Sequence, residues 1–204
     1  MGTGHEQAMP LLKTDATYDD LVELPDHLVA EIVDGRLHAS PRPAIPHANA
    51  ASLLGAILIP AFHQRMGGLG GWWLLNEPEL HLSGDVLVPD IGGWRLERML
   101  KLPTTAAFSM APDWVCEVAS PSTERFDRVE KLPVYARVGV AHVWLVNPLQ
   151  RTLEVFRRDG SNWTLVVAHG GGGLIRVEPF DAIEWDLGRL WDDAEERSEP
   201  PAVG

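Results

Sequence analysis

The chain has 204 residues, of which 45% are hydrophobic and 23% are charged, and its net charge is −12. This length and composition predict one globular domain with a substantial core and exclude a largely disordered chain. The acidic charge argues against a simple nucleic-acid-binding protein, because phosphate contacts normally need a basic surface.

The N-terminal part predicts a loose end, a short helix and a hairpin. Residues 1–13 show no periodicity. A helix should start after Thr17, because Asp20 stands where a capping box requires an acid. Two strands are predicted over residues 28–33 and 36–39, and the Asp-Gly pair between them is a strong hairpin signal.

The longest predicted helix covers residues 47–66 and follows a proline-rich connector. It is rich in Ala and Leu, the glycine at position 67 should end it, and Pro60 should kink it. Its apolar core, residues 50–62, is too short to span a bilayer. Further strands are then predicted over residues 72–75, 79–82 and 86–94.

The second half of the chain contains strands around one charged helix. A strand over residues 113–119 precedes a helix over residues 124–138. Residues 142–147 are apolar and predict a central strand. Residues 152–157 and 162–168 predict an outer hairpin.

This order of elements predicts the mixed α/β (α+β) class, with a mixed central sheet flanked by helices and an added N-terminal hairpin. We expect a single domain over residues 14–190, with a flexible N-terminus (1–13) and an acidic C-terminal tail (191–204). Residues 181–204 contain eight acids and two arginines, so they carry half of the net charge. The start of the chain has neither a basic region nor an apolar segment, so a cytoplasmic protein without a membrane partner is expected.

Two acidic side chains occupy positions in otherwise apolar strands. Asp90 should lie on the same strand face as Val88, and Glu117 on the same face as Val115. A buried carboxylate is costly unless it has a cation, a hydrogen-bond network or a proton. A divalent ion held by both acids would offset that cost, because Mg²⁺ commonly binds one or two carboxylates together with waters and substrate phosphates.

An ion at this place would polarise a phosphoryl oxygen and lower the pKa of a bound water. Hydrolysis of a phosphodiester would also need a cation close to the developing negative charge. Lys131 is the best candidate for that cation, because it lies on the helix that follows the strand of Glu117.

Structural interpretations of these residues remain open. Asp90 would then cap a strand end, and Glu117 would pair with an arginine. Lys131 would be a solvated helix charge. Glu31 would be an ordinary acid of the hairpin, and His47 a helix cap or surface group.

Several runs of residues carry a family resemblance. They are Asp113-Trp-Val-Cys-Glu117-Val-Ala-Ser-Pro-Ser-Thr123, residues 127–140, His142-Val-Trp-Leu-Val-Asn147-Pro, Val88-Pro-Asp90, Glu31-Ile-Val-Asp34-Gly35 and Ser40-Pro-Arg-Pro43. Together they resemble the Uma-two family of proposed restriction endonucleases, within the PD-(D/E)XK nuclease superfamily. The resemblance extends over residues 18–190 and implies a restriction-endonuclease-like core.

The resemblance also implies roles for individual residues. Asp90 and Glu117 would bind the divalent metal, Mg²⁺ or Mn²⁺, and Glu31 would be a further catalytic acid. In the superfamily pattern a lysine stands two residues after the second acid, where this chain has Ala119. Lys131 would replace that lysine from the helix.

Two further residues are candidate accessory groups. Tyr135 follows Lys131 by four positions and should lie on the same helix face. His47 follows the proline-rich connector that belongs to the family pattern. Pro133 lies inside the same predicted helix, and a proline there should either start the helix near Lys131 or kink it.

The leading hypothesis is therefore a metal-dependent DNA endonuclease that hydrolyses phosphodiester bonds. A homodimer is expected, because a duplex has two strands to cut and two-fold protomers often read symmetric sites. The alternative is a catalytically inactive binding or assembly module on the same fold, which Ala119, Pro133 and the acidic charge favour. A third hypothesis is a hydrolase of another phosphate ester.

Overall fold

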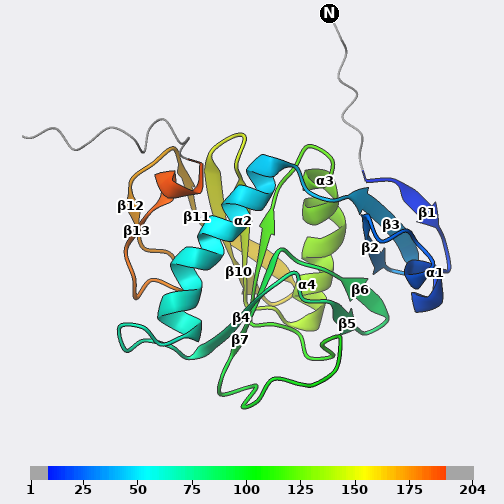
Figure 1. The fold of residues 1–204 in the computed structure, drawn as a ribbon, viewed down its shortest axis with the longest axis horizontal. Coiled ribbons are helices and arrows are strands. Elements are labelled where there is room, and N and C mark those ends of the chain that lie inside the picture. The colour runs from blue at the N-terminus through cyan, green and yellow to red at the C-terminus, as the bar shows by residue number, and fades with distance from the viewer. Residues whose placement is uncertain (1–8, 192–204) are drawn as a thin grey trace, which may run out of the picture.

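The computed structural model describes residues 9–191, and Figure 1 shows their arrangement. The strands are β1 (Leu11–Lys13), β2 (Leu28–Val33), β3 (Arg36–Pro41), β4 (Trp72–Asn76), β5 (Leu80–Leu82), β6 (Asp85–Leu87), β7 (Ile91–Arg95), β8 (Trp114–Val118), β9 (His142–Asn147), β10 (Thr152–Asp159), β11 (Asn162–Gly170), β12 (Leu174–Ile175) and β13 (Trp185–Asp186). The helical elements are α1 (Tyr18–Val22), α2 (Ile45–Leu58), the π-helical turns η1 (Ile59–His63) and η2 (Asp127–Lys131), α3 (Glu124–Phe126), α4 (Leu132–Val138) and the short 3₁₀ helix η3 (Leu187–Leu190).

A six-stranded mixed sheet forms the centre of the fold, in the order β11-β10-β9-β8-β7-β4. Only β8 and β9 run parallel, and the other neighbours are antiparallel. The helix α2 packs on one face, and the helix made of α3, η2 and α4 packs on the other. The mixed α/β fold with a central sheet flanked by helices, predicted from the sequence, is therefore confirmed.

The strand β8 separates two apolar clusters, because its side chains alternate between the faces of the sheet. Trp114 and Cys116 pack with Leu54 of α2, whereas Val115 packs with Tyr135 of α4. Cys116 is therefore a buried packing residue that points away from the Glu117 side, as its position in the strand predicts. Glu117 consequently faces the helix that carries Lys131.

A second, smaller sheet contains the N-terminal hairpin, in the order β1-β3-β2-β6-β5. The hairpin of β2 and β3 is confirmed, and β3 extends two residues beyond its predicted end. The capping box of Thr17 and Asp20 is present at the start of α1. Residues 11–13, placed in the loose terminus by their lack of periodicity, instead form β1 at the edge of this sheet. Residues 1–8 and 192–204, with most of the predicted acidic tail, lie outside the described residues.

The single strand predicted over residues 86–94 is wrong. The chain forms β6 in the small sheet, leaves it at Val88 and Pro89, and enters the large sheet as β7. Proline cannot donate a ladder hydrogen bond, so a strand interrupted at Pro89 changes partners there. Asp90 consequently lies at the crossing between the two sheets, after β6 ends and immediately before β7 begins.

Both long helices contain a π-helical turn next to a proline. In the first, η1 follows α2 and contains Pro60, where the sequence predicted a kink. In the second, the amide N–H of Leu132 bonds to the carbonyl of Asp127, five residues back, immediately before Pro133. The missing N–H of a proline makes a regular turn impossible there, and a π turn is one way to accommodate it. The predicted helix over residues 124–138 is continuous as a result.

The helical segment Ile45–His63 is long and apolar enough, by length and composition alone, to cross a membrane. Its side chains Ala50, Leu54, Leu58 and Phe62 are nevertheless buried in the core against the large sheet. The core helix of a globular protein meets the same criterion, and 33% of the apolar 18-residue window is buried inside the structure. The helix has 19 residues and is therefore longer than the apolar run of residues 50–62, which the sequence marked as too short to span a bilayer.

Candidate active site

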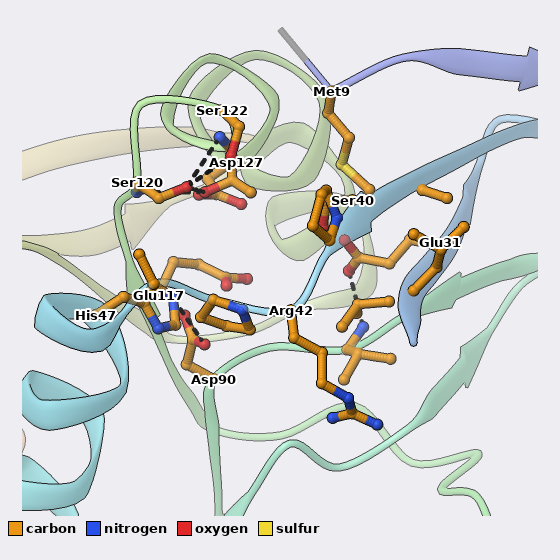
Figure 2. Close-up of a pocket in the computed structure, with 18 of the residues that line it drawn as sticks. Met9, Glu31, Ser40, Arg42, His47, Asp90, Glu117, Ser120, Ser122 and Asp127 are labelled. Atoms are coloured by element: carbon orange, nitrogen blue, oxygen red, sulfur yellow. Dashed lines mark hydrogen bonds and ion pairs between the residues drawn. The ribbon is translucent and has the colours of Figure 1, made fainter. Parts of the chain in front are cut away.

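The sequence-predicted site residues line one cavity of about 910 Å³ between the small sheet, the start of α2 and the start of α3. Figure 2 shows Asp90, Glu117 and His47 grouped together, with Glu31 entering from the hairpin. Lys131 lines the same cavity, whereas Tyr135 lies behind it. The fold therefore brings together side chains from the hairpin, the sheet crossing, β8 and two helices.

Lys131 lies at the centre of these side chains and is only 2% exposed. Its Nζ lies 2.8 Å from Oε1 of Glu117 and 2.9 Å from Oε1 of Glu31. The ammonium also donates to the carbonyl oxygen of Val88 at 3.4 Å. An ammonium has three N–H donors, so these three acceptors can occupy all of them. Lys131 is therefore a buried ion-pair centre and not a solvated helix charge.

Glu117 takes its position from β8 and its orientation from the helix. The hydroxyl of Tyr135 donates to Oε1 of Glu117 at 2.5 Å, and the Lys131 contact uses the same oxygen. These two contacts leave Oε2 of Glu117 for another ligand. Glu117 has no arginine among its ion-pair partners in the described part of the chain, so the predicted alternative of a Glu117–arginine pair is wrong.

Asp90 is fixed by two contacts from opposite sides. The backbone N–H of Val118 donates to its Oδ2 at 2.6 Å, and Nε2 of His47 lies 3.1 Å from its Oδ1. The segment that carries Asp90 is also held by Glu31, whose Oε1 accepts a hydrogen bond from the N–H of Val88 at 2.8 Å. His47 is thus a partner of a candidate ligand, which is more than a surface or capping role.

Asp127 is a site residue that the sequence analysis did not select. Its Oδ1 lies 3.7 Å from Nζ of Lys131, and the carboxyl group is buried. The signal was the spacing of Asp127, Lys131 and Tyr135, because residues four positions apart share one helix face. Charged residues on a helix usually face solvent, so the spacing alone did not mark Asp127 as buried.

The pKa values of these groups follow from burial and mutual charge. Burial raises the pKa of Glu117 well above its usual value, Lys131 opposes that rise, and the neighbouring carboxylates add to it. Burial likewise raises the pKa of Asp127 to about 7. Burial would lower the pKa of Lys131, but Glu117 and Glu31 outweigh it and hold that pKa well above its usual value. The pKa of Tyr135 is raised by burial and by Glu117.

The site therefore holds more acid than the protein itself compensates. Glu31, Glu117 and Asp127 surround one ammonium group, and the charge of Asp90 also acts on Glu117. Like charges at short range destabilise one another in a buried site. Within residues 9–191, no three His, Cys, Asp or Glu side chains converge as a complete metal site. The donor set thus suits a hard ion that takes one or two carboxylates and fills its other positions with water and phosphate, and it does not suit an all-protein cage.

Comparisons with known proteins identify the fold and the family of the chain. The chain is similar to a crystal structure described as a putative nuclease belonging to DUF820 from Anabaena variabilis, with a TM-score of 0.68 and 19% sequence identity over 86% of this chain and 97% of that one. At this identity the likeness shows the fold alone. No curated protein matches the chain. The model of the Uma2 family, described as "Putative restriction endonuclease", matches residues 16–188, and the chain therefore belongs to that family.

Proposed function

We propose that the chain is a metal-dependent nuclease that hydrolyses phosphodiester bonds of DNA, with Asp90 and Glu117 as ligands of Mg²⁺ or Mn²⁺. The observation that carries this proposal is the convergence of three carboxylates, those of Glu31, Glu117 and Asp127, on the buried ammonium of Lys131, in a cavity that Asp90 also lines. Family membership supports the same chemistry. A cytoplasmic location and a homodimer belong to the same proposal.

The ion, when bound, would polarise a phosphoryl oxygen and lower the pKa of an attacking water. Asp90 and Glu117 fit this ion because each has a carboxylate oxygen that can accept a further ligand. Asp90 reaches the cavity with 15% of its side chain exposed, so an ion and a phosphate can approach it. Glu31 is the third acid, and it keeps the crossing segment in place through Val88.

Lys131 supplies a fixed positive charge beside the reacting phosphate. A preorganised cation in a buried site stabilises developing negative charge more than a solvated one does. Tyr135 acts on Glu117, because its hydroxyl holds Oε1 and thereby fixes the plane of the carboxylate. His47 acts in the same way on Asp90, through Oδ1. Tyr135 and His47 are therefore positioning residues.

The first prediction concerns the two proposed ligands. We expect Glu117→Gln and Asp90→Asn to lower DNA cleavage in Mg²⁺ or Mn²⁺ by at least about a thousandfold, because each removes a charge that the ion requires. Titration calorimetry with Mn²⁺ should show one site in the unaltered chain and greatly weakened binding in Asp90→Asn. Loss of cleavage should thus accompany loss of metal affinity.

A matched control is available on the same helix. Glu130 pairs with Arg36 at 2.7 Å and does not line the cavity, so Glu130→Gln should leave both metal binding and cleavage close to those of the unaltered chain. Undiminished cleavage by Glu117→Gln would contradict the proposed site. Absence of Mn²⁺ binding at millimolar concentration would contradict the metal-dependent function.

A second candidate function is a catalytically inactive binding or assembly module. The observation in its favour is that Lys131 has its donors occupied by Glu117, Glu31 and Val88, and that Ala119 stands at the usual lysine position. In such a module the ion pairs of Lys131 would only stabilise the fold. Mn²⁺ binding combined with no cleavage of any nucleic acid would support the module over the nuclease.

A further inference from the structure

We propose that the cavity accepts an unpaired nucleotide, so that the chain acts on single-stranded or frayed DNA in preference to intact duplex. This inference rests on the proposed function and names the form of its substrate. It follows from the burial of the acids, from the apolar side chains that line the same cavity and from the few cations around it.

Most of the charged groups that line the cavity are buried. Glu117 and Lys131 are each 2% exposed and Asp127 is 5% exposed, whereas Asp90 has 15% of its side chain exposed. Duplex DNA is stiff over many base pairs, so its phosphates cannot descend singly into a pocket without deformation. An unpaired strand is flexible and can bring one phosphodiester to Glu117. Enzymes that act on a base, which is hidden inside a duplex, meet the same problem and take single-stranded or extruded nucleotides.

Apolar side chains also line the cavity. They are Met9, Leu12 of β1, Leu28 and Val29 of β2, Pro41 at the end of β3 and Pro43 after it. Leu12 is 47% exposed, so its side chain is accessible to a ligand in the cavity. A phosphate or a sugar gains little from such a surface, whereas the face of a base packs well against apolar side chains. The cavity therefore offers acids to the phosphodiester and an apolar wall to a base.

Positive charge around the cavity is sparse. Among the described residues that line it, the guanidinium and ammonium groups are those of Arg42 and Lys131, and Lys131 is already paired with acids. Duplex affinity comes largely from several phosphate contacts at once. Binding of a single strand depends more on packing of individual bases. A volume of about 910 Å³ lies in the range of pockets that enclose a small ligand, which suits a nucleotide and not a duplex.

The test is equilibrium binding, which does not depend on turnover. A short fluorescent oligodeoxynucleotide, alone or annealed to its complement, is titrated with the full chain in Ca²⁺ buffer, and anisotropy is recorded. We expect the single strand to bind at least about tenfold more tightly than the duplex. Leu12→Asn should weaken binding of the single strand about fivefold and leave duplex binding unchanged, because it replaces part of the apolar wall.

Leu11→Asn is the matched control. Leu11 is 51% exposed and precedes Leu12 in β1, but it does not line the cavity, so this variant should bind like the unaltered chain. Equal affinity for single strand and duplex would overturn the inference, and so would equal losses in the two leucine variants. Failure of the proposed function is separable, because it would appear as absent cleavage while the binding preference persists.

Discussion

At the scale of single residues, Asp127 shows how burial turns an ordinary helix acid into part of a site. Its carboxyl group is buried beside Lys131, and its pKa is raised to about 7, mainly by burial. The unfolded chain releases this proton near the ordinary value of 3.8. The folded state therefore holds the proton more strongly than the unfolded state. The stability that this contributes is fully present below pH 3.8 and is lost as the pH rises through about 7.

The expected result is a pH-dependent gain in the variant Asp127→Asn, because asparagine resembles the protonated acid but cannot ionise. In chelator, its free energy of unfolding should exceed that of the unaltered chain already at pH 5, because the loss begins near pH 3.8, and this excess should be larger by about 2–3 kcal/mol at pH 8. Urea unfolding at both pH values measures this. The exposed Asp26 provides the control, since Asp26→Asn should leave the pH dependence unchanged. An identical pH dependence in Asp127→Asn would show that Asp127 does not hold a proton in the folded state.

At the scale of elements, the π turn η2 sets the position of Lys131. Pro133 follows the turn and prevents a regular hydrogen bond to Val129, so the helix widens by one residue just where the site lysine lies. A widened turn rotates the residues before it relative to those after it. As a result, Lys131 at the end of the turn and Tyr135 after it both contact Glu117. Asp127, at the start of the turn, contacts Lys131.

The variant Pro133→Ala should fold, because it restores an N–H donor, but it should allow a regular α-helical turn that moves the ammonium group. We expect DNA cleavage to fall about tenfold with little change in the free energy of unfolding, since small displacements in a site cost large factors in rate. Pro60→Ala is the control, because Pro60 lies in the other π turn and does not line the cavity. Equal cleavage by Pro133→Ala and the unaltered chain would show that the turn does not depend on Pro133.

Much of the architecture was predictable from local pattern. The hairpin of β2 and β3 and the helix over residues 124–138 follow from turn chemistry and periodicity, which are local properties of the chain. The division of residues 86–94 between two sheets was not predictable, because the alternation of side chains is the same whichever strand becomes the partner. The contact between Glu31 and Lys131 joins residues 100 positions apart, and only the assembled fold determines it.

At the scale of the whole molecule, charge is expected to limit access of DNA. Residues 192–204 contain five acids and one arginine, a net charge of −4 out of −12. A chain that ends at residue 191 should therefore bind oligodeoxynucleotides several-fold more tightly at low salt, and the gain should vanish at high salt because exposed charges are then screened.

Anisotropy titrations over a range of salt concentrations measure this effect. A full-length chain in which the five acids are replaced by their amides is the control, and it should behave like the shortened chain if charge is responsible. If the shortened chain binds more tightly than the amide-substituted chain, the effect comes from the presence of residues 192–204 and not from their charge. No difference from the unaltered chain at low salt would show that this charge does not oppose binding.

The crossing segment of residues 88–90 has a mechanical consequence. At one end of the segment, Glu31 accepts a hydrogen bond from the N–H of Val88, and Lys131 donates to the carbonyl of Val88. At the other end, the carboxylate of Asp90 contacts the N–H of Val118 and the imidazole of His47. A tilt of the hairpin sheet would therefore pull Glu31 and the ammonium apart and shift Asp90 in the same movement. A DNA strand bound against Leu12 of β1 would move the hairpin sheet and, with it, the groups that contact the crossing segment. Substrate binding and alignment of the acids would then occur together.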